Sequence, residues 1–439
     1  MSRLSVSLRE WETLRPEHGS PLINRNLCNS EAVRELAERL TERGQLEVLE
    51  LARGLELRAT SFVGRFTLGD ITVTVRPKLS GAPFLRLLRY AYGLRDLHLY
   101  TPVDFDSAKW AFQDLLLLQL ASETRELLTR GIHRDYERIS ADLTNPRGKI
   151  DFGDFVKMVS RARGVLPCVH HPRTEDTILN QALLAGVLYG TQLATDKDLR
   201  DHLSRLAKIL SATISIKNLD AILLTEARRA MDRRTQAYDP ALILIELLFQ
   251  GEGVLLDVGT NRVRVPGFLF DMNRFFQTLM SRFLHEHLEG YEIQDEYRLK
   301  ELFCYDSDRN PLRRRAPVQK PDFVIRRNRK IAAILDAKYR DLWEKPLPRE
   351  MLYQLALYAL GQAGNDCKAV ILYPNLAAEA SEQVILIREP VSGVTQAQVI
   401  LRPVNLLKLE QLLQCRDWQT NQRKAELASQ LSFGSVRDN

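Results

Sequence analysis

The chain has 439 residues, of which 45% are hydrophobic and 27% are charged. This composition excludes a largely disordered or fibrous protein and gives enough length for two or three hydrophobic cores. The formal net charge of +6 and the sequence pI near 9.0 permit a polyanionic partner without requiring one.

Cysteine usage and hydropathy indicate the compartment. The five cysteines include no Cys-x-x-Cys pair, which argues against a zinc ribbon or a disulfide framework and for a reducing environment. The N-terminus lacks the basic-then-apolar pattern of a signal peptide. The longest apolar stretch, residues 241–249, is short and contains Glu246, so it cannot span a membrane. We therefore expect a cytoplasmic protein without a membrane partner.

The first part of the chain, residues 1–104, is predicted to be a β-rich, partner-binding module. A helix is expected over residues 31–43, followed by strands over residues 55–60, 62–68 and 71–75. In the last of these strands apolar and polar residues alternate, which is typical of a strand with one buried face.

The middle of the chain, residues 105–254, is predicted to be mainly helical, with leucine-rich faces that form a core. The expected helices cover residues 110–130, 177–193, 199–212 and 219–238, and a further one begins near Pro240. Two short motifs, Arg134-Asp135-Tyr136 and Arg147-Gly148-Lys149, are either buried ion-pair and turn positions or contacts to a partner. We favour the structural interpretation.

The remaining part, residues 255–439, has the element order of an α/β domain. The expected elements are a helix over residues 271–288 capped by Asp271, a strand over 291–299, a hairpin around 322–338, a helix over 349–360 and a strand over 369–373. Two added edge strands, over residues 384–387 and 398–402, and an amphipathic helix from residue 406 complete the domain. The fold class expected for the whole chain is α/β and multidomain.

The hairpin places two carboxylates and a lysine at the ends of paired strands. Two apolar runs flank a polar turn, so that Asp322 enters the first strand and Asp336 and Lys338 leave the second. Because side chains alternate along a strand, Asp336 and Lys338 lie on the same side, and Ala337 between them offers its carbonyl oxygen.

These groups fit the hydrolysis of a phosphodiester. Asp322, Asp336 and the Ala337 carbonyl supply the oxygen ligands that Mg²⁺ prefers. Lys338 is placed to orient, or help to deprotonate, a water that attacks phosphorus. The alternative is that both carboxylates are solvated strand ends and that Lys338 is a surface lysine.

The helix expected over residues 349–360 carries a second pair of polar groups. Gln354 and Tyr358 are four residues apart, so they share one face of the helix. From that face they can reach toward the scissile phosphate or toward Lys338. They can equally be ordinary positions of an amphipathic helix.

Positive charge is concentrated beside the hairpin. Between residues 309 and 330 there are nine arginine or lysine residues and a single acid, Asp322. Such a segment binds the phosphates of DNA, although a solubilising loop has a similar composition. The residues expected to contact DNA are Arg313, Arg314, Arg315, Lys320, Arg326 and Arg327.

The hairpin and the next helix resemble the nuclease core of the PD-(D/E)xK superfamily, and Gln354-x-x-x-Tyr358 resembles the additional motif of its RecB-like branch. More narrowly, the chain resembles the McrC family, the nuclease subunits of McrBC-type modification-dependent restriction systems. The segments that carry this resemblance are, in order, GRFTLGDITVTVRPK at 64–78, LLRYAY at 87–92, RDY at 134–136, PRGKIDF at 146–152, TEDTxxN at 174–180 and DMNR at 271–274.

The resemblance implies a C-terminal PD-(D/E)xK endonuclease domain that cuts modified, double-stranded DNA with Mg²⁺. It also implies that an N-terminal domain inserts into a ring of McrB-type AAA+ GTPase subunits and stimulates their NTP hydrolysis. The sequence agrees in lacking a nucleotide site of its own. Its only Gly-Lys pair, Gly148-Lys149, has Leu143 where a Walker A loop needs its first glycine.

At one position the chain departs from that family. The helix that begins at Asp271 usually carries a glutamate, and this chain has Gln277 there, which has no negative charge to offer a metal ion. Either Asp271 or Glu286 contributes instead, or the site functions with Asp322 and Asp336. Two other functions therefore stay open. One is a non-cleaving adaptor and activator of an AAA+ motor, and the other is a RecB-like repair nuclease that acts without such a partner.

Overall fold

A computed structural model of the chain separates into two compact units. The first unit consists of Met1–Val63, Leu68–Arg95 and Asp271–Asn439, and the second of Gly64–Thr67 and Asp96–Phe270. The first unit is therefore built from both ends of the sequence. The structure describes residues 4–27, 31–79, 81–94, 112–154, 165–251, 255–258, 261–264, 267–300, 302–306, 308–328, 330–362, 367–415 and 417–434.

Residues 4–94 contain the predicted helix and strands, together with three further strands and a second helix. Strands β1 (Leu4–Arg9) and β6 (Ile71–Arg76) pair in parallel, and β5 (Phe62–Leu68) lies on the other side of β6. A second sheet has the order β2 (Thr13–Leu14), β4 (Gly54–Ala59), β3 (Leu46–Leu51). The helices are α1 (Glu31–Glu42) and α2 (Gly81–Tyr92). Strands β1, β2 and β3 and helix α2 were not predicted, although Val6 and Leu8 alternate with polar residues in β1 and are buried.

The second unit contains a helical bundle, as predicted. Its helices are α3 (Phe112–Arg130), α5 (Ile178–Leu193), α6 (Lys197–Leu210), α7 (Ala221–Arg229) and α8 (Asp239–Gln250). The single helix expected over residues 219–238 is wrong, because the chain leaves α7 and forms only a short 3-10 turn at Gln236–Tyr238. The Asp232 side chain accepts hydrogen bonds from the backbone N–H groups of Arg234 and Thr235, which replaces helical hydrogen bonding there.

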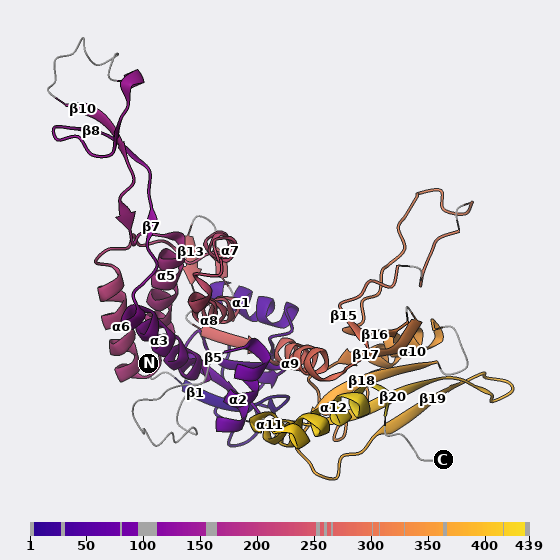
Figure 1. Cartoon of the computed structure of the whole chain (residues 1–439). Helices are drawn as coiled ribbons and strands as arrows, with labels where there is room; N and C mark the ends of the chain where they lie inside the picture. The colour runs from indigo at the N-terminus through magenta and orange to yellow at the C-terminus, as the bar shows by residue number, and fades with distance from the viewer. Residues whose placement is uncertain are drawn as a thin grey trace. The chain divides into compact units, whose positions relative to one another are not determined.

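A long β-ribbon was not predicted in the second unit. It is built from β7 (Asp135–Tyr136), β8 (Ile139–Leu143), β9 (Lys149–Ile150), β10 (Leu166–His170) and β11 (Arg173–Thr174), and it projects away from the helices that flank it (Figure 1). The unit also includes the hairpin of β12 (Leu255–Val258) and β13 (Asn261–Arg264), and β14 (Gly267–Asp271) beside β5.

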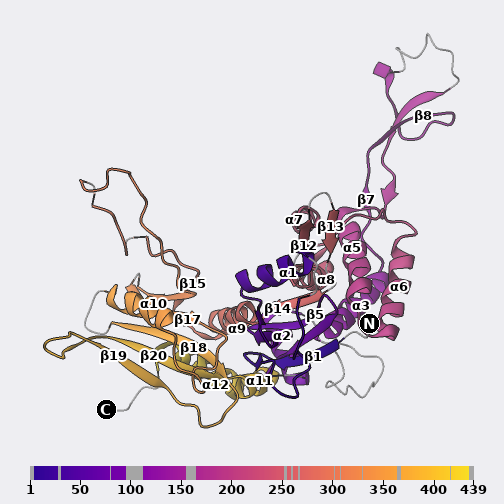
Figure 2. The ribbon, with the colours of Figure 1, turned by 180° about the vertical axis from the view of Figure 1, so that it is seen from behind.

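The C-terminal part of the first unit is a six-stranded mixed sheet, visible from both sides in Figures 1 and 2. Its order is β15 (Glu292–Asp295), β16 (Phe323–Arg327), β17 (Lys330–Ala337), β18 (Lys368–Asn375), β20 (Thr395–Asn405), β19 (Gln383–Arg388). The expectation of two edge strands is half wrong. β19 is an edge strand, but β20 lies inside the sheet and pairs in parallel with β18, consistent with its consecutive buried residues 399–402.

Helices cover this sheet. Helix α10 (Arg349–Leu360) packs its Leu355, Tyr358 and Ala359 onto apolar residues of β17, β18 and β20. Helices α9 (Met272–His287) and α12 (Trp418–Phe433) also contact β17, and α11 (Leu406–Gln414) contacts β20. Residues 435–439 lie outside the described residues. Within the described ranges, no helix is both long and apolar enough to cross a membrane.

Candidate active site

The structure brings Asp322, Asp336 and Lys338 together at one end of the hairpin. β16 and β17 pair antiparallel with Phe323 opposite Leu335. Asp322 directly precedes Phe323 and Asp336 directly follows Leu335, so the two acids lie side by side. The Ala337 N–H donates a hydrogen bond of 2.7 Å to Asp322 Oδ2. Lys338 Nζ lies 3.1 Å from Asp336 Oδ2 and 3.7 Å from Asp322 Oδ2. The three charged groups therefore form one cluster.

The local sequence explains why the hairpin forms. Phe323, Val324 and Ile325 are fully buried, and runs of such β-branched and aromatic residues favour strands. Arg327 pairs with Lys330, so the turn has two residues. Its first residue, Asn328, has φ of 52°, which asparagine tolerates better than most residues.

Burial and mutual charge set the electrostatics of this cluster. Burial, reinforced by the charge of Asp336, raises the pKa of Asp322 well above the usual range of a carboxyl group. Burial alone would lower the pKa of Lys338, but the attraction of Asp336 and Asp322 outweighs it and the pKa is raised. The lysine is thus held as a cation between two acids, where it partly offsets their repulsion.

The donor set fits a hard cation. Asp336 is 2% exposed, and its Oδ1 is buried without a hydrogen-bond partner among the residues that the structure describes. An orphaned carboxylate oxygen beside a second carboxylate offers ligands of the type that Mg²⁺ uses while it keeps several waters. Across the described segments, no cluster of three or more His, Cys, Asp or Glu side chains is arranged to hold a metal. Any cation here would rely on these two carboxylates.

Gln277 stands where the sequence resemblance led us to expect a third acid. Its Nε2 donates a hydrogen bond of 3.1 Å to Asp322 Oδ1. Asp271 instead caps α9, where it accepts from the N–H groups of Asn273 and Arg274. Glu286 is bonded to Tyr90 and Arg282, away from this cluster. Of the alternatives raised by the sequence, neither Asp271 nor Glu286 replaces the missing glutamate.

Helix α10 brings its polar pair to the same face. Ile334 lies two residues before Asp336 on β17 and packs with Tyr358, so α10 covers the side of the sheet that carries Asp336. Gln354 Nε2 donates a hydrogen bond of 2.7 Å to the Tyr358 hydroxyl. Burial and the charge of Asp336 raise the pKa of Tyr358, which keeps its proton on the oxygen.

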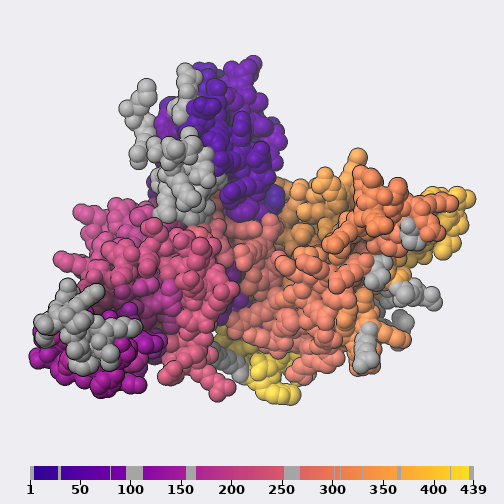
Figure 3. Space-filling model, turned by 90° about the horizontal axis from the view of Figure 1, so that it is seen from above, coloured from indigo at the N-terminus to yellow at the C-terminus, as the bar shows by residue number. Residues whose placement is uncertain are grey.

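The predicted DNA-binding residues fall into two groups. Arg313, Arg314, Arg315 and Lys320 are exposed on a loop that extends from the end of β15 in Figure 1 and contributes to the orange surface seen in Figure 3. Arg326 and Arg327 are consecutive on β16 and so point to opposite faces of the sheet. Their guanidinium groups lie over different rings, Arg326 at 4.4 Å from the centre of Tyr297 and Arg327 at 5.4 Å from that of Tyr291. Arg329 is not among the described residues.

A set of hydrogen bonds that was not predicted from the sequence fixes Tyr339, the residue directly after Lys338. The Tyr339 N–H donates to Asn273 Oδ1 at 3.0 Å, and Asn273 Nδ2 donates to the Ser61 hydroxyl at 2.6 Å. The Tyr339 hydroxyl donates to Glu10 Oε1 at 3.2 Å, and the Lys78 N–H donates to the same oxygen at 2.5 Å. Asn273 lies in the DMNR segment and Lys78 ends the GRFTLGDITVTVRPK segment. Both segments were noted in the sequence as family motifs, but their role in holding Tyr339 is seen only in the contacts.

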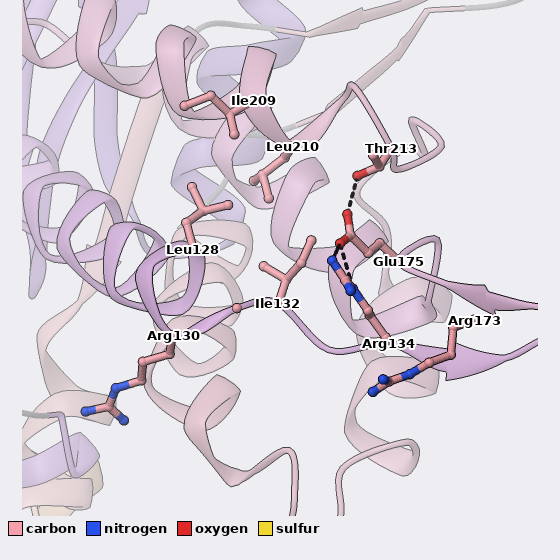
Figure 4. A pocket seen from close by; sticks show the side chains of 10 residues that line it. Leu128, Arg130, Ile132, Arg134, Arg173, Glu175, Ile209, Leu210 and Thr213 are labelled. Atoms are coloured by element: carbon pink, nitrogen blue, oxygen red, sulfur yellow. Dashed lines mark hydrogen bonds and ion pairs between the residues drawn. The ribbon is translucent and has the colours of Figure 1, made fainter.

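The second unit has its own pocket of about 510 Å³ near the base of the β-ribbon (Figure 4). On its wall Arg134 donates from two nitrogens to Glu175 Oε1, at 2.8 and 2.6 Å, and Glu175 Oε2 accepts from Thr213 at 2.8 Å. At Gly148, with φ of +73°, a Cβ would lie 2.4 Å from the Val169 carbonyl oxygen. The two motifs therefore have an ion-pair role and a turn role, but the expected burial is wrong, because Arg134, Asp135 and Tyr136 are exposed.

Comparisons with known proteins were made for the sequence and for the fold. A chain of the refined half-complex from a tetradecameric assembly of Thermococcus gammatolerans McrB AAA+ hexamers with bound McrC is similar, with a TM-score of 0.63 and 19% identity over 96% of this chain and 98% of that chain. A chain of the cryo-EM structure of the Thermococcus gammatolerans McrBC complex has a TM-score of 0.47 and 18% identity over 64% of this chain and 88% of that chain. No match was found among curated proteins.

The family comparison agrees with the resemblance seen in the sequence. The profile of the family described as McrBC 5-methylcytosine restriction system component matches residues 57–374. That range includes Ser61, Gln277, Asp322, Asp336 and Lys338. Because the match extends over well more than half of the sequence, the chain belongs to the McrBC restriction system component family.

Proposed function

We propose that this chain is the DNA endonuclease subunit of a McrBC-type, modification-dependent restriction system, with a PD-(D/E)xK nuclease domain. The observation that carries the proposal is the convergence of Asp322, Asp336 and Lys338 at the end of a β-hairpin. Family membership and the fold shared with a chain of a McrB–McrC assembly support the same conclusion.

In this proposal the protein groups have separate roles. Asp322 and Asp336, with the Ala337 backbone, hold Mg²⁺, which when bound supplies positive charge that offsets the charge of the phosphate undergoing hydrolysis. Lys338 orients the attacking water from its position between the two acids. Gln354 holds the Tyr358 hydroxyl against this face, so that Tyr358 can donate a hydrogen bond to the substrate. The exposed arginines 313–315 and Lys320 bind the DNA backbone.

The partner in this proposal is a ring of McrB-type AAA+ GTPase subunits. It is supported by the similar assembly from Thermococcus gammatolerans, in which McrC is bound to McrB AAA+ hexamers. Nucleotide hydrolysis would belong to that partner, whose activity this chain stimulates. The DNA substrate would be double-stranded and modified.

The test is plasmid cleavage with Mg²⁺, in the presence and absence of the neighbouring AAA+ protein and GTP. Asp336→Asn and Lys338→Ala are expected to lower cleavage by at least about a hundredfold, because each removes a group in direct contact with the reaction. Glu379→Gln, which changes an exposed acid on a loop, serves as the control. GTP hydrolysis by the partner should still be stimulated by all three variants.

A second candidate function is favoured by Gln277, which leaves Asp322 without a third acid beside it. In that case the chain is an adaptor that activates the AAA+ motor and binds DNA without cutting it. Stimulated GTP hydrolysis with no cleavage by the wild-type complex, with any divalent metal, would establish the adaptor. Cleavage without any partner would instead favour a RecB-like repair nuclease.

A further inference from the structure

A cavity of about 1120 Å³ opens on the sheet near the candidate active site. Residues at the end of β15 and just after it, together with β16, β17 and α10, form its wall. Tyr358 belongs to this wall, as does Ile334, which lies two residues before Asp336 on β17. The cavity is therefore on the same face of the sheet as the carboxylates, and its volume slightly exceeds the roughly 300–1,000 Å³ of common ligand pockets.

Strand geometry gives the spacing between the cavity and the site. Arg326 lines the cavity on β16 and lies four residues after Asp322, which directly precedes that strand. Residues four apart in a strand share a face and are separated by about 13 Å, since each residue advances about 3.3 Å. Gln294 on β15 pairs with Val324, so its side chain emerges on this face as well. A group bound in the cavity would thus lie about 13 Å from the carboxylates, which suits a neighbouring nucleotide of a bound strand and is too far for the reacting phosphate.

The wall combines an aromatic ring, a cation and unsatisfied polar atoms. The Arg326 guanidinium lies over the Tyr297 ring, 4.4 Å from its centre. Arg326 Nε and Gln294 Oε1 are buried and have no hydrogen-bond partner within the described part of the chain. Such atoms cost free energy unless a ligand satisfies them. The cavity wall therefore offers one unpaired donor, Arg326 Nε, and one unpaired acceptor, Gln294 Oε1, to a ligand.

Apolar side chains complete the surface. Ile331 is 40% exposed at the cavity, and Leu299 and Leu302 are half-buried beside it. A base needs an apolar or aromatic surface for its flat face and polar atoms at its edge, and a backbone phosphate needs a cation. Arg298, Lys300 and Arg326 bring positive charge to the wall, and Asp295 and Glu296 bring negative charge, so the basic residues outnumber the acids.

We infer that this cavity binds one nucleotide of the DNA strand that is cut, a few nucleotides from the scissile phosphate. The base stacks on Tyr297, Gln294 contacts the edge of the base, and Arg326 binds the adjacent phosphate. The inference rests on the proposed nuclease function and adds to it a subsite that fixes the path of the strand across the sheet. Tyr297 and Arg326 are thus positioning residues, since neither touches the reacting atoms.

The chain supplies a matched control for this subsite. Arg327 lies over Tyr291, 5.4 Å from the ring centre, in the same kind of cation–ring pair one residue along β16. It points to the opposite face of the sheet, and neither Arg327 nor Tyr291 lines the cavity. Tyr291→Ala therefore removes an equivalent ring outside the cavity.

The experiment measures plasmid cleavage by the full complex with the AAA+ partner, GTP and Mg²⁺. Tyr297→Ala is expected to raise KM for DNA about tenfold, the size of one lost stacking contact, with kcat within about twofold of wild type. Tyr297→Phe and Tyr297→Trp should restore KM, because each retains a ring. Arg326→Gln should raise KM and reduce its dependence on salt. Tyr291→Ala should behave as wild type.

Binding is measured separately with the full chain carrying Asp336→Asn and a 12-base-pair duplex with a short single-stranded end that contains 2-aminopurine. Stacking on Tyr297 should quench its fluorescence, and Tyr297→Ala should abolish the quenching while Tyr291→Ala does not. The circular dichroism spectrum and Tm of each variant establish that it is folded. Should Tyr297→Ala fail to fold, Arg326→Gln decides the question.

Two results would overturn the inference. One is a KM for Tyr297→Ala and Arg326→Gln that equals that of Tyr291→Ala. The other is loss of AAA+ partner binding by Tyr297→Ala with unchanged DNA binding, which would assign the cavity to a protein contact. Quenching of 2-aminopurine without cleavage by the wild-type complex would refute the nuclease function and leave the nucleotide subsite standing.

Discussion

A single side chain distinguishes this candidate site from the site that the sequence resemblance led us to expect. Gln277 Nε2 donates to Asp322 Oδ1 at 3.1 Å, where a glutamate would present a third negative charge. The amide satisfies one oxygen of Asp322 and leaves Asp336 Oδ1 without a partner among the described residues. With two acids and one lysine the cluster carries little net charge when empty, so we expect it to be stable without a metal and to bind Mg²⁺ weakly.

Gln277→Glu tests this expectation. The added carboxylate should lower the Tm in the presence of EDTA, because three acids then repel one another. It should also lower the Mg²⁺ concentration needed for half-maximal stabilisation by about tenfold. Thermal unfolding across a Mg²⁺ titration measures both effects, with Thr278→Glu, one residue along α9, as the control of equal charge. An equal response of the two variants to Mg²⁺ would show that position 277 does not face the cation.

At the scale of elements, the end of β1 and the segment after β17 are joined through a buried acid. Glu10 is 3% exposed, and its Oε1 accepts from the Lys78 N–H and the Tyr339 hydroxyl. Its Oε2 is buried with no partner within the described segments. Burial raises the pKa of Glu10 from its ordinary value of 4.5 to about 7, against the opposing effects of Lys78 and Tyr339. The hydrogen bonds of Glu10 therefore fix Tyr339 and the backbone next to Lys338.

A raised pKa in the folded state makes this contribution to stability depend on pH. The contribution is fully present below pH 4.5, where Glu10 is protonated in both states, and it is lost as the pH rises toward 7. The loss amounts to at most about 3 kcal/mol. Glu10→Gln stays neutral, so we expect its stability relative to wild type to increase between pH 5 and pH 8. Urea unfolding at both pH values measures the difference, with the exposed Glu12→Gln as control, and parallel curves for Glu10→Gln and wild type would contradict it.

At the scale of the whole molecule, the first compact unit depends on both ends of the chain. Phe84 of α2 packs edge-on against Phe275 of α9, with ring centres 5.2 Å apart. Arg282 of α9 donates to the Tyr90 carbonyl at 2.7 Å, and Arg86 forms an ion pair with Glu410 of α11. Residues of α2 therefore pack against α9 and α11, the helices that contact the six-stranded sheet.

This arrangement predicts that residues 271–439 do not fold independently. Removing α2 exposes buried residues of α9, and each large apolar side chain left in water costs roughly 1.5–3 kcal/mol. We expect this fragment to lack a cooperative unfolding transition, and co-expression with residues 1–95 to restore one. Calorimetry of the fragment with and without its partner tests this, and a fragment that alone unfolds at the Tm of the full chain would refute it.

Local sequence was sufficient where a pattern repeats over a few residues. The helices over 271–288 and 349–360, the hairpin that carries Asp322 and Asp336, and the helix pair Gln354 and Tyr358 were all predicted, because apolar periodicity and turn residues act within one element. The family resemblance was likewise predicted from ordered motifs and is confirmed. The order of the strands in the sheet was not predicted, because the pairing of β20 with β18 joins residues that no local pattern connects.

The family, the types of most elements and the residues of the candidate cluster could be predicted before folding was considered, because each depends on residue identity and short-range spacing. Folding was needed to place Gln277 beside Asp322 and Tyr339 against Glu10, and to direct Arg326 and Arg327 to opposite faces of the sheet. These are contacts between residues up to hundreds of positions apart. They arise from the packing of whole elements, which one-dimensional spacing does not encode.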